Sequence, residues 1–261
     1  MKVISLNTWG GRGGMDGLLN FFRDHNEVDI FCLQEVWNGG EEMVGKIGGG
    51  VPLVDVETDL LSRIARVLPE HVPYFRPHFH EYYGLAMLVR NTLPVESEEE
   101  CTIYKERGFI SEEDPGNHAR IIQAVTLGGD APNTVAHLHG LWQPMPKEVL
   151  AVTSGKQDNP DRIEQSRRVV SFMQTVSHPF VLLGDFNLLP DSESIAMLER
   201  VGMRNLIKEY GIEGTRTSLY TKPGRFADYA FVSEGIEVLD FKVLPDEVSD
   251  HAPLYLEYSL S

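Results

Sequence analysis

The sequence predicts an α/β fold, because short apolar runs typical of buried strands alternate along the chain with segments of helical periodicity. The chain has 261 residues, of which 42% are hydrophobic, so it can bury a substantial core. No fixed-period repeat divides it, and no segment has the composition of an interdomain linker. We therefore expect a single domain over residues 1–261.

The apolar runs have the length and composition of buried strands. They cover residues 3–6, 30–33, 85–89, 121–127, 134–138, 180–183, 229–232, 238–243 and 254–258. So many strands predict one large sheet or two. The triple glycine at 48–50 and the acidic stretch 96–100 are interpreted as loops, because glycine clusters and uncompensated charges rarely lie inside packed elements.

Helical spacing of apolar residues appears in three segments, at 18–22, 60–68 and 163–173. The third is the clearest helix, and Asp161 with Glu164 resembles a capping arrangement at its start. A shorter helix is expected over residues 192–201. Asp191 or Ser192 would cap it, and Gly202 would end it.

Charge and cysteine content limit the partners and the compartment. The formal net charge of -16 disfavours extended nonspecific binding to duplex nucleic acid, which normally needs a basic face. Of the two cysteines, Cys32 lies inside an apolar run, so a reducing cytoplasm fits better than a disulfide framework. No apolar run approaches the ~18 residues of a membrane span, and no cleaved targeting peptide is expected. Nothing indicates an obligate protein partner, and we expect a monomer.

Polar side chains recur where apolar runs end or begin. In open α/β folds, loops at the strand ends bring distant residues together over a rigid support. Each residue taken alone is equally compatible with a turn or a surface position. Together they would form a pocket rich in carboxylate and amide oxygens, which suits Mg²⁺ or Mn²⁺. The residues are Asn7, Glu35, Asp185, Asn187, Asp250 and His251.

The order and spacing of these segments resemble the endonuclease/exonuclease/phosphatase superfamily over nearly the whole chain. The resemblance implies a four-layer α/β sandwich, in which two mixed β-sheets pack face to face and are flanked by helices. The matching segments are Ser5-Leu6-Asn7-Thr8-Trp9, Leu33-Gln34-Glu35-Val36, Tyr83-Gly84-Leu85-Ala86, Ala136-His137-Leu138, Gly184-Asp185-Phe186-Asn187, Asp228-Tyr229 and Ser249-Asp250-His251-Ala252-Pro253-Leu254.

The resemblance also implies a role for each matching residue. The implied metal ligands, for Mg²⁺ or Mn²⁺, are Asn7, Glu35 and Asp250. The implied catalytic residues are His137, Asp185, Asn187, Asp228 and His251. Asp185 and Asn187 would activate and hold the attacking water. His251, oriented by Asp228, and His137 would stabilise charge on the phosphate oxygens.

Two features depart from the family pattern or leave it open. Family members commonly carry a basic residue two positions before the aspartate that matches Asp228, whereas here Arg225 lies three positions before it. Trp142 follows the strand that carries His137 and would either stack on a substrate base or pack its own loop. Arg120, which begins a strand, is the arginine most compatible with a place at the pocket.

The resemblance implies a metal-dependent hydrolase of phosphate esters. A nuclease or DNA/RNA phosphodiesterase acting on ends, short strands or covalent adducts is the first hypothesis. The alternatives are a lipid-headgroup phosphodiesterase, which the likeness of Leu6-Asn7-Thr8-Trp9-Gly10 to neutral sphingomyelinases suggests, and an inositol phosphatase. A noncatalytic binding protein is the third class, and the filled catalytic positions argue against it.

Overall fold

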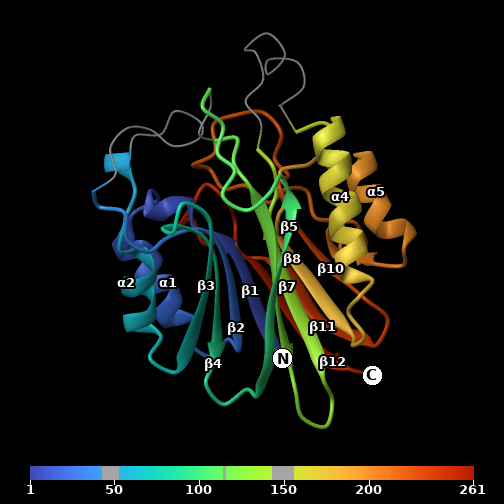
Figure 1. The fold of residues 1–261 in the computed structure, drawn as a ribbon. Coiled ribbons are helices and arrows are strands. Elements are labelled where there is room, and N and C mark those ends of the chain that lie inside the picture. Colours follow the sequence, from blue (N-terminus) through green and yellow to red (C-terminus); the bar gives the residue numbers. More distant parts are fainter. Residues whose placement is uncertain (43–52, 114–115, 143–155) are drawn as a thin grey trace.

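The computed structural model describes residues 1–42, 53–113, 116–142 and 156–261. Two six-stranded mixed sheets pack face to face, and helices cover the outer face of each (Figure 1). The expected four-layer α/β sandwich is thereby confirmed. The predicted triple glycine loop at 48–50 lies outside the described residues.

All of the predicted strands are present, most of them longer than their apolar runs. The first sheet has the order β11 (Ile236–Val243), β12 (Leu254–Leu260), β1 (Lys2–Asn7), β2 (Ile30–Trp37), β4 (Tyr83–Arg90), β3 (His71–Phe79). The second sheet has the order β5 (Val95–Tyr104), β6 (Arg120–Leu127), β7 (Asn133–His139), β8 (Phe180–Asp185), β10 (Asp228–Val232), β9 (Arg204–Asn205).

Helices α1 and α2 lie against the first sheet, and α4 and α5 lie against the second (Figure 1). The helical elements are η1 (Trp9–Gly11), α1 (Met15–Asp24), η3 (Leu53–Asp55), α2 (Leu60–Val67), α4 (Pro160–Met173), α5 (Glu193–Arg200) and α6 (Leu206–Glu209). None of the helices in the described ranges is long and apolar enough to cross a membrane.

The central strands β1, β2 and β4 of the first sheet are buried on both faces, as their continuous apolar runs predict. Successive side chains of a strand point to opposite faces. Accordingly, Val3 and Cys32 belong to the core between the two sheets, whereas Ile4 and Phe31 belong to the core beneath α1 and α2. The sheets are thus fixed in register by apolar packing on each side, which provides a rigid support for the residues at the strand ends.

Each sheet contains one parallel pair near its centre, β1 with β2 and β7 with β8, and the two pairs face each other. Asn7 ends β1 beside Gln34 of β2, and His139 ends β7 beside Asp185 of β8. The carboxyl ends of four central strands therefore meet at one end of the sandwich, where open α/β folds bind ligands.

The loop expected at 96–100 is wrong, because these residues form most of the edge strand β5. The charges of Glu98 and Glu100 are compensated across the sandwich. Arg76 of β3, the edge strand of the other sheet, lies 2.6 Å from Glu98 and 3.5 Å from Glu100. Gln123 also donates to Glu98 at 2.7 Å. Arg76 lies more than twenty residues before both glutamates, so this pairing is not visible in the local sequence, and Arg107 forms a further ion pair with Glu100.

The expected cap of α4 is also corrected. Asn159, rather than Asp161 with Glu164, caps this helix, because its side chain accepts a hydrogen bond from the backbone N–H of Arg162 at 2.9 Å. Pro160 then occupies the first turn, where its missing N–H costs no hydrogen bond. The expected cap of α5 is confirmed, with the Ser192 side chain accepting from Ile195.

Candidate active site

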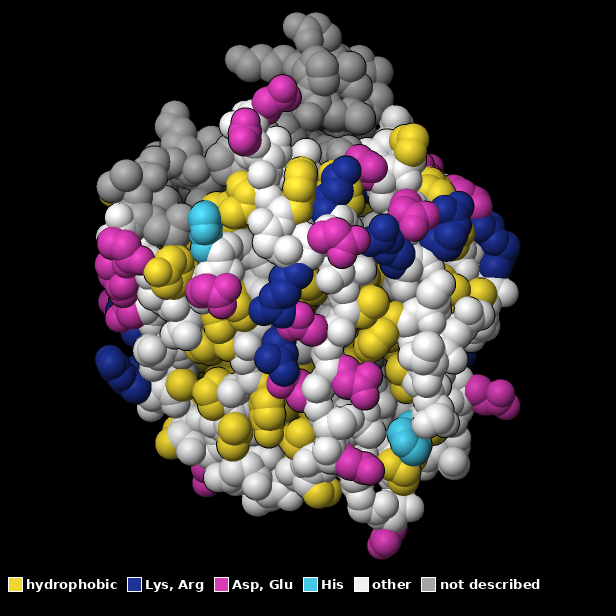
Figure 2. Space-filling view, viewed as in Figure 1, with side chains coloured by type: hydrophobic (Ala, Val, Ile, Leu, Met, Phe, Trp, Pro, Cys, Tyr) yellow, Lys and Arg dark blue, Asp and Glu magenta, His cyan; other side chains and the backbone are white. Residues whose placement is uncertain are grey.

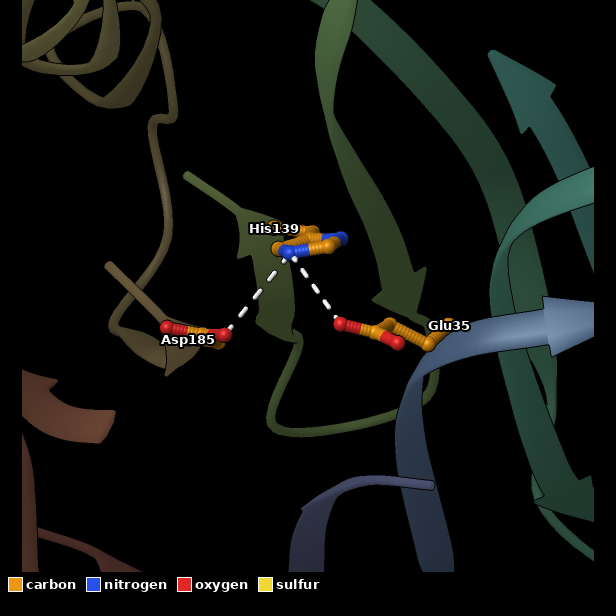
Figure 3. A group of neighbouring side chains, drawn as sticks. All are labelled: Glu35, His139 and Asp185. Atoms are coloured by element: carbon orange, nitrogen blue, oxygen red, sulfur yellow. Dashed lines mark ion pairs between the residues drawn. The ribbon is translucent and has the colours of Figure 1, made fainter. Parts of the chain in front are cut away.

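The side chains of Glu35, His139 and Asp185 converge from three central strands (Figure 3). Nε2 of His139 lies 3.8 Å from Oε1 of Glu35 and 3.7 Å from Oδ2 of Asp185. Asn7 joins the two carboxylates, donating from Nδ2 to Glu35 at 3.1 Å and to Asp185 at 3.0 Å. The sheets thus bring together residues separated by more than a hundred positions.

A bulge in β2 aims Glu35 into this site. The pairing of β2 with β4 shifts between Leu33 and Val36, and Glu35 takes a positive φ of 57°. Bulges re-aim a side chain without ending the sheet. The hydroxyl of Thr8 donates to the carbonyls of Gln34 and Glu35 at 2.9 and 3.0 Å and so secures the irregular backbone.

A tight turn at the end of β8 presents Asp185 and Asn187 together. Gly184 has a φ of +128°, and a Cβ there would lie 2.2 Å from the carbonyl oxygen of Leu138, so only glycine fits. The backbone N–H of Asn187 donates to Oδ1 of Asp185 at 2.9 Å. The turn therefore fixes Asp185 while its Oδ2 faces Asn7 and the histidines.

A second pair of residues, Asp228 and His251, completes the cluster. Nδ1 of His251 lies 2.9 Å from both carboxylate oxygens of Asp228, and Nε2 lies 3.6 Å from Oδ2 of Asp185. Burial, together with the nearby Arg216 cation, lowers the pKa of His251 to about 4. Burial raises the pKa of Asp228 to about 7, although Arg216 opposes this shift. Asp228 thus holds the ring with Nε2 toward Asp185.

The carboxylates of the site crowd one another. Burial, Asp250 and Asp185 raise the pKa of Glu35 to about 7, against the hydrogen bond from Asn7. Oδ1 of Asp250 is buried without a hydrogen-bond partner among the described residues. A divalent cation would offset this repulsion, because a bound ion is the largest local charge in such a site. These carboxylate oxygens are the hard donors that Mg²⁺ or Mn²⁺ prefers, so the residues present fit such an ion.

Asp250 lies in an ion pair that the sequence did not predict. Oδ2 of Asp250 lies 2.9 Å from the Arg216 guanidinium, and both side chains are almost fully buried. Arg216 forms a backbone bridge with His251, and its guanidinium stacks on Tyr220 with 4.2 Å between Cζ and the ring centroid. No apolar run marks this segment as a strand partner, so only the fold brings it to the site.

His137 is not brought to the cluster. Its ring is fully buried deeper on β7, where Nδ1 lies 3.0 Å from Nε2 of Gln34 and Nε2 lies 2.9 Å from Oε1 of Gln123. Both ring nitrogens therefore have glutamine partners. His139 takes the position at the carboxylates that His137 was expected to take. The sequence did contain one indication of this: His139 comes two residues after His137 and therefore lies nearer the carboxyl end of β7.

The other residues that the sequence pointed to lie around the site. Arg120 is buried, and its guanidinium is directed at the backbone carbonyls of Gly116, Ala119 and Gly140. Arg225 donates to the carbonyl of Arg216 at 3.1 Å. Trp142 is half-buried and lies 5.7 Å from the Lys222 ammonium, in a cation–π contact. Arg225 therefore contacts the backbone of the segment that carries the site arginine.

Comparisons with known proteins agree with this fold. A family model described as the endonuclease/exonuclease/phosphatase family matches residues 4–251. A search of curated proteins gives no sequence that matches this chain. Solved structures resemble it at low sequence identity, and their likeness concerns the fold.

Three of these structures show which kinds of protein share the fold. The mannosyl-6-phosphatase of Bacteroides thetaiotaomicron is 17% identical, with a TM-score of 0.71 and all of both chains covered. The human Nocturnin catalytic domain with bound sulfate is 16% identical, with a TM-score of 0.65, and the match covers 100% of this chain and 93% of that one. ANGEL2, a 2′,3′-cyclic phosphatase in complex with adenosine-2′,3′-vanadate, is 15% identical with a TM-score of 0.67, covering 99% and 95%.

Proposed function

Because the chain belongs to the endonuclease/exonuclease/phosphatase family, we propose that it is a divalent-metal-dependent enzyme that hydrolyses a phosphate ester with an activated water. The observation that carries this proposal is the convergence of Glu35, His139 and Asp185 beside the Asp228–His251 pair. Carboxylates, an ordered amide and two imidazoles at one end of a rigid sandwich are the groups that phosphoryl transfer from an anionic ester requires.

Glu35 would be the principal metal ligand, and Asn7 would position it together with Asp185. When bound, Mg²⁺ or Mn²⁺ would supply positive charge to the phosphate oxygens. Asn7 donates to both carboxylates while its Oδ1 accepts from the backbone N–H of Trp9 at 2.9 Å. This bond orients the amide, so we assign Asn7 to ordering the two carboxylates.

Asp185 would accept the proton of the attacking water, and Asn187 would help to hold that water. Nε2 of His139 and Nε2 of His251 lie 3.7 and 3.6 Å from Oδ2 of Asp185, beyond ordinary hydrogen-bond length. Neither imidazole is tied to this carboxylate, so each can donate to a phosphate oxygen. The Asp228 carboxylate would stabilise His251 when its ring carries a proton.

We further propose a substrate that needs no extended basic surface. The net charge is -16, and on the face in Figure 2 the Lys and Arg side chains (dark blue) lie among Asp and Glu (magenta) without forming a continuous stripe. Nucleic-acid ends, short single strands and covalent adducts satisfy this condition, and a nuclease or phosphodiesterase acting on them is the first candidate. A phosphatase of small phosphate esters is the second, supported by the structural likeness to a mannosyl-6-phosphatase.

That the protein is a monomer in a reducing cytoplasm stays a prediction. Both cysteines are free thiols.

A hydrolysis panel tests the proposal. The purified chain would be assayed with Mg²⁺, Mn²⁺ or chelator on single- and double-stranded DNA, RNA, a 5′-tyrosyl adduct, inositol phosphates, sugar phosphates and sphingomyelin. We expect chelator-sensitive cleavage of one class, with duplex DNA cleaved poorly. Cleavage that persists in chelator and survives Glu35→Gln would refute the metal-dependent assignment.

A further inference from the structure

The buried ion pair between Arg216 and Asp250 places a fixed cation inside the acidic site. Its two side chains are only 6% and 11% exposed, and the guanidinium N–H donates to Oδ2 of Asp250 at 2.9 Å. Tyr220 backs the guanidinium, and Thr217 hydrogen-bonds through N–H and hydroxyl to the backbone of Asp250 and Ser249. The arginine is thus held by its backbone, its carboxylate partner and a ring.

The described residues contain two groups that could each bind an ion, and both include Asp185. One consists of Glu35, His139 and Asp185, and the other of Asp185, Asp228 and His251. Arg216 bridges to His251 through the backbone and pairs with the adjacent Asp250, so its charge belongs to the second side.

We propose that Arg216 serves as the second cation of the active site, so that the enzyme binds one divalent ion, on the side of Glu35, rather than two. An ion bound to Asp250 would share this carboxylate with the guanidinium, which already lies 2.9 Å from Oδ2. In a buried site such like charges repel strongly, because little water screens them. Arg216 also takes one of the two oxygens that Asp250 offers.

The consequence for catalysis rests on the proposed phosphoesterase function. In two-metal phosphoesterases the second ion stabilises negative charge on the opposite side of the phosphate. Here the guanidinium of Arg216 would supply positive charge on that side as part of the chain, without being acquired from solution. Catalysis should then depend on the concentration of a single ion, with no second, weaker activating step.

Metal stoichiometry tests this inference independently of turnover. The full chain would be titrated with Mn²⁺ by equilibrium dialysis, and bound Mn²⁺ would be examined by electron paramagnetic resonance. We expect one ion per wild-type chain and a spectrum without coupling between neighbouring Mn²⁺ ions. Two ions per chain would overturn the role of Arg216 and leave the proposed function standing. No bound ion would overturn the metal-dependent function and the inference with it.

Variants locate the effect. Arg216→Met keeps the length and apolar stem of the side chain but frees Asp250, and should raise the stoichiometry toward two. Arg216→Lys keeps the positive charge and should still bind one ion per chain. The double variant Arg216→Met with Asp250→Asn lacks the freed carboxylate and should again bind one ion per chain. Arg200→Met, on the surface, is the control for the change in net charge. Folding is checked by circular dichroism, and a folded Arg216→Met that still binds one ion would overturn the inference. The number of ions bound per wild-type chain tests the inference even if a variant does not fold.

Discussion

His137 and His139 point to the same side of β7, two residues apart, but only His139 reaches the carboxylates of Glu35 and Asp185. We therefore expect His139→Ala to lower kcat by ~10²–10⁴-fold, the usual contribution of a proton-donating or charge-stabilising group. His137→Gln, which can keep hydrogen bonds to Gln34 and Gln123, should retain most of kcat. Steady-state kinetics on the best substrate of the panel would measure both. A large loss of kcat in His137→Gln with little loss in His139→Ala would assign the charge-stabilising role to His137 instead.

Stability should depend on pH through His137. Burial lowers its pKa to about 3, whereas an exposed histidine titrates near 6.5. The unfolded chain therefore binds the proton first, and this contribution to stability is lost as pH falls from about 6.5 toward 3. Urea unfolding at pH 7, 5 and 4 should give His137→Gln a shallower dependence than wild type, by up to ~1.4 kcal/mol per pH unit. If the unfolding free energy of wild type and of His137→Gln changed equally with pH, the His137 ring would not be held neutral in the folded protein.

Asp228 should act through His251, because it touches the ring at 2.9 Å while Nε2 of the ring faces Asp185. Asp228→Asn should lower kcat by ~10²–10⁴-fold with a small change in KM, since it removes the charge that orients and stabilises the imidazolium. Asp240→Asn, which alters an exposed carboxylate on β11, is the matched control. If kcat fell equally in both variants, the loss would reflect general charge rather than this contact.

Substituting Glu35 should mainly affect metal binding, whereas substituting Asp185 should mainly affect turnover. Glu35→Gln should weaken Mn²⁺ binding and shift the metal dependence of the rate to higher concentration. Asp185→Asn should bind Mn²⁺ nearly as well as wild type and lose almost all turnover, because its carboxylate would accept the proton of the water. Calorimetric titration with Mn²⁺ alongside kinetics would measure the two effects. Equal loss of Mn²⁺ affinity in both variants would make Asp185 a ligand as well.

The apolar runs determined the central strands, because strands buried on both faces must be apolar along their length. The edge strands β3 and β5 escaped prediction, since one contains Pro73 and Pro77 and the other a row of glutamates. Edge strands tolerate both, because one side of their backbone needs no ladder partner. The ion pairs of Arg76 that stabilise β5 join residues from different sheets.

By itself, the sequence determined which polar side chains follow or precede an apolar run within a few residues, although β2 continues past Glu35 to Trp37. The resemblance gave Glu35, Asp185, Asn187, Asp228 and His251 their expected roles, and the fold brings these residues into one site. Only the tertiary structure decided that His139 rather than His137 reaches the carboxylates, and that Arg216 pairs with Asp250. The physical reason is that depth along a strand and contacts between distant loops depend on how the two sheets stack, which local sequence patterns do not encode.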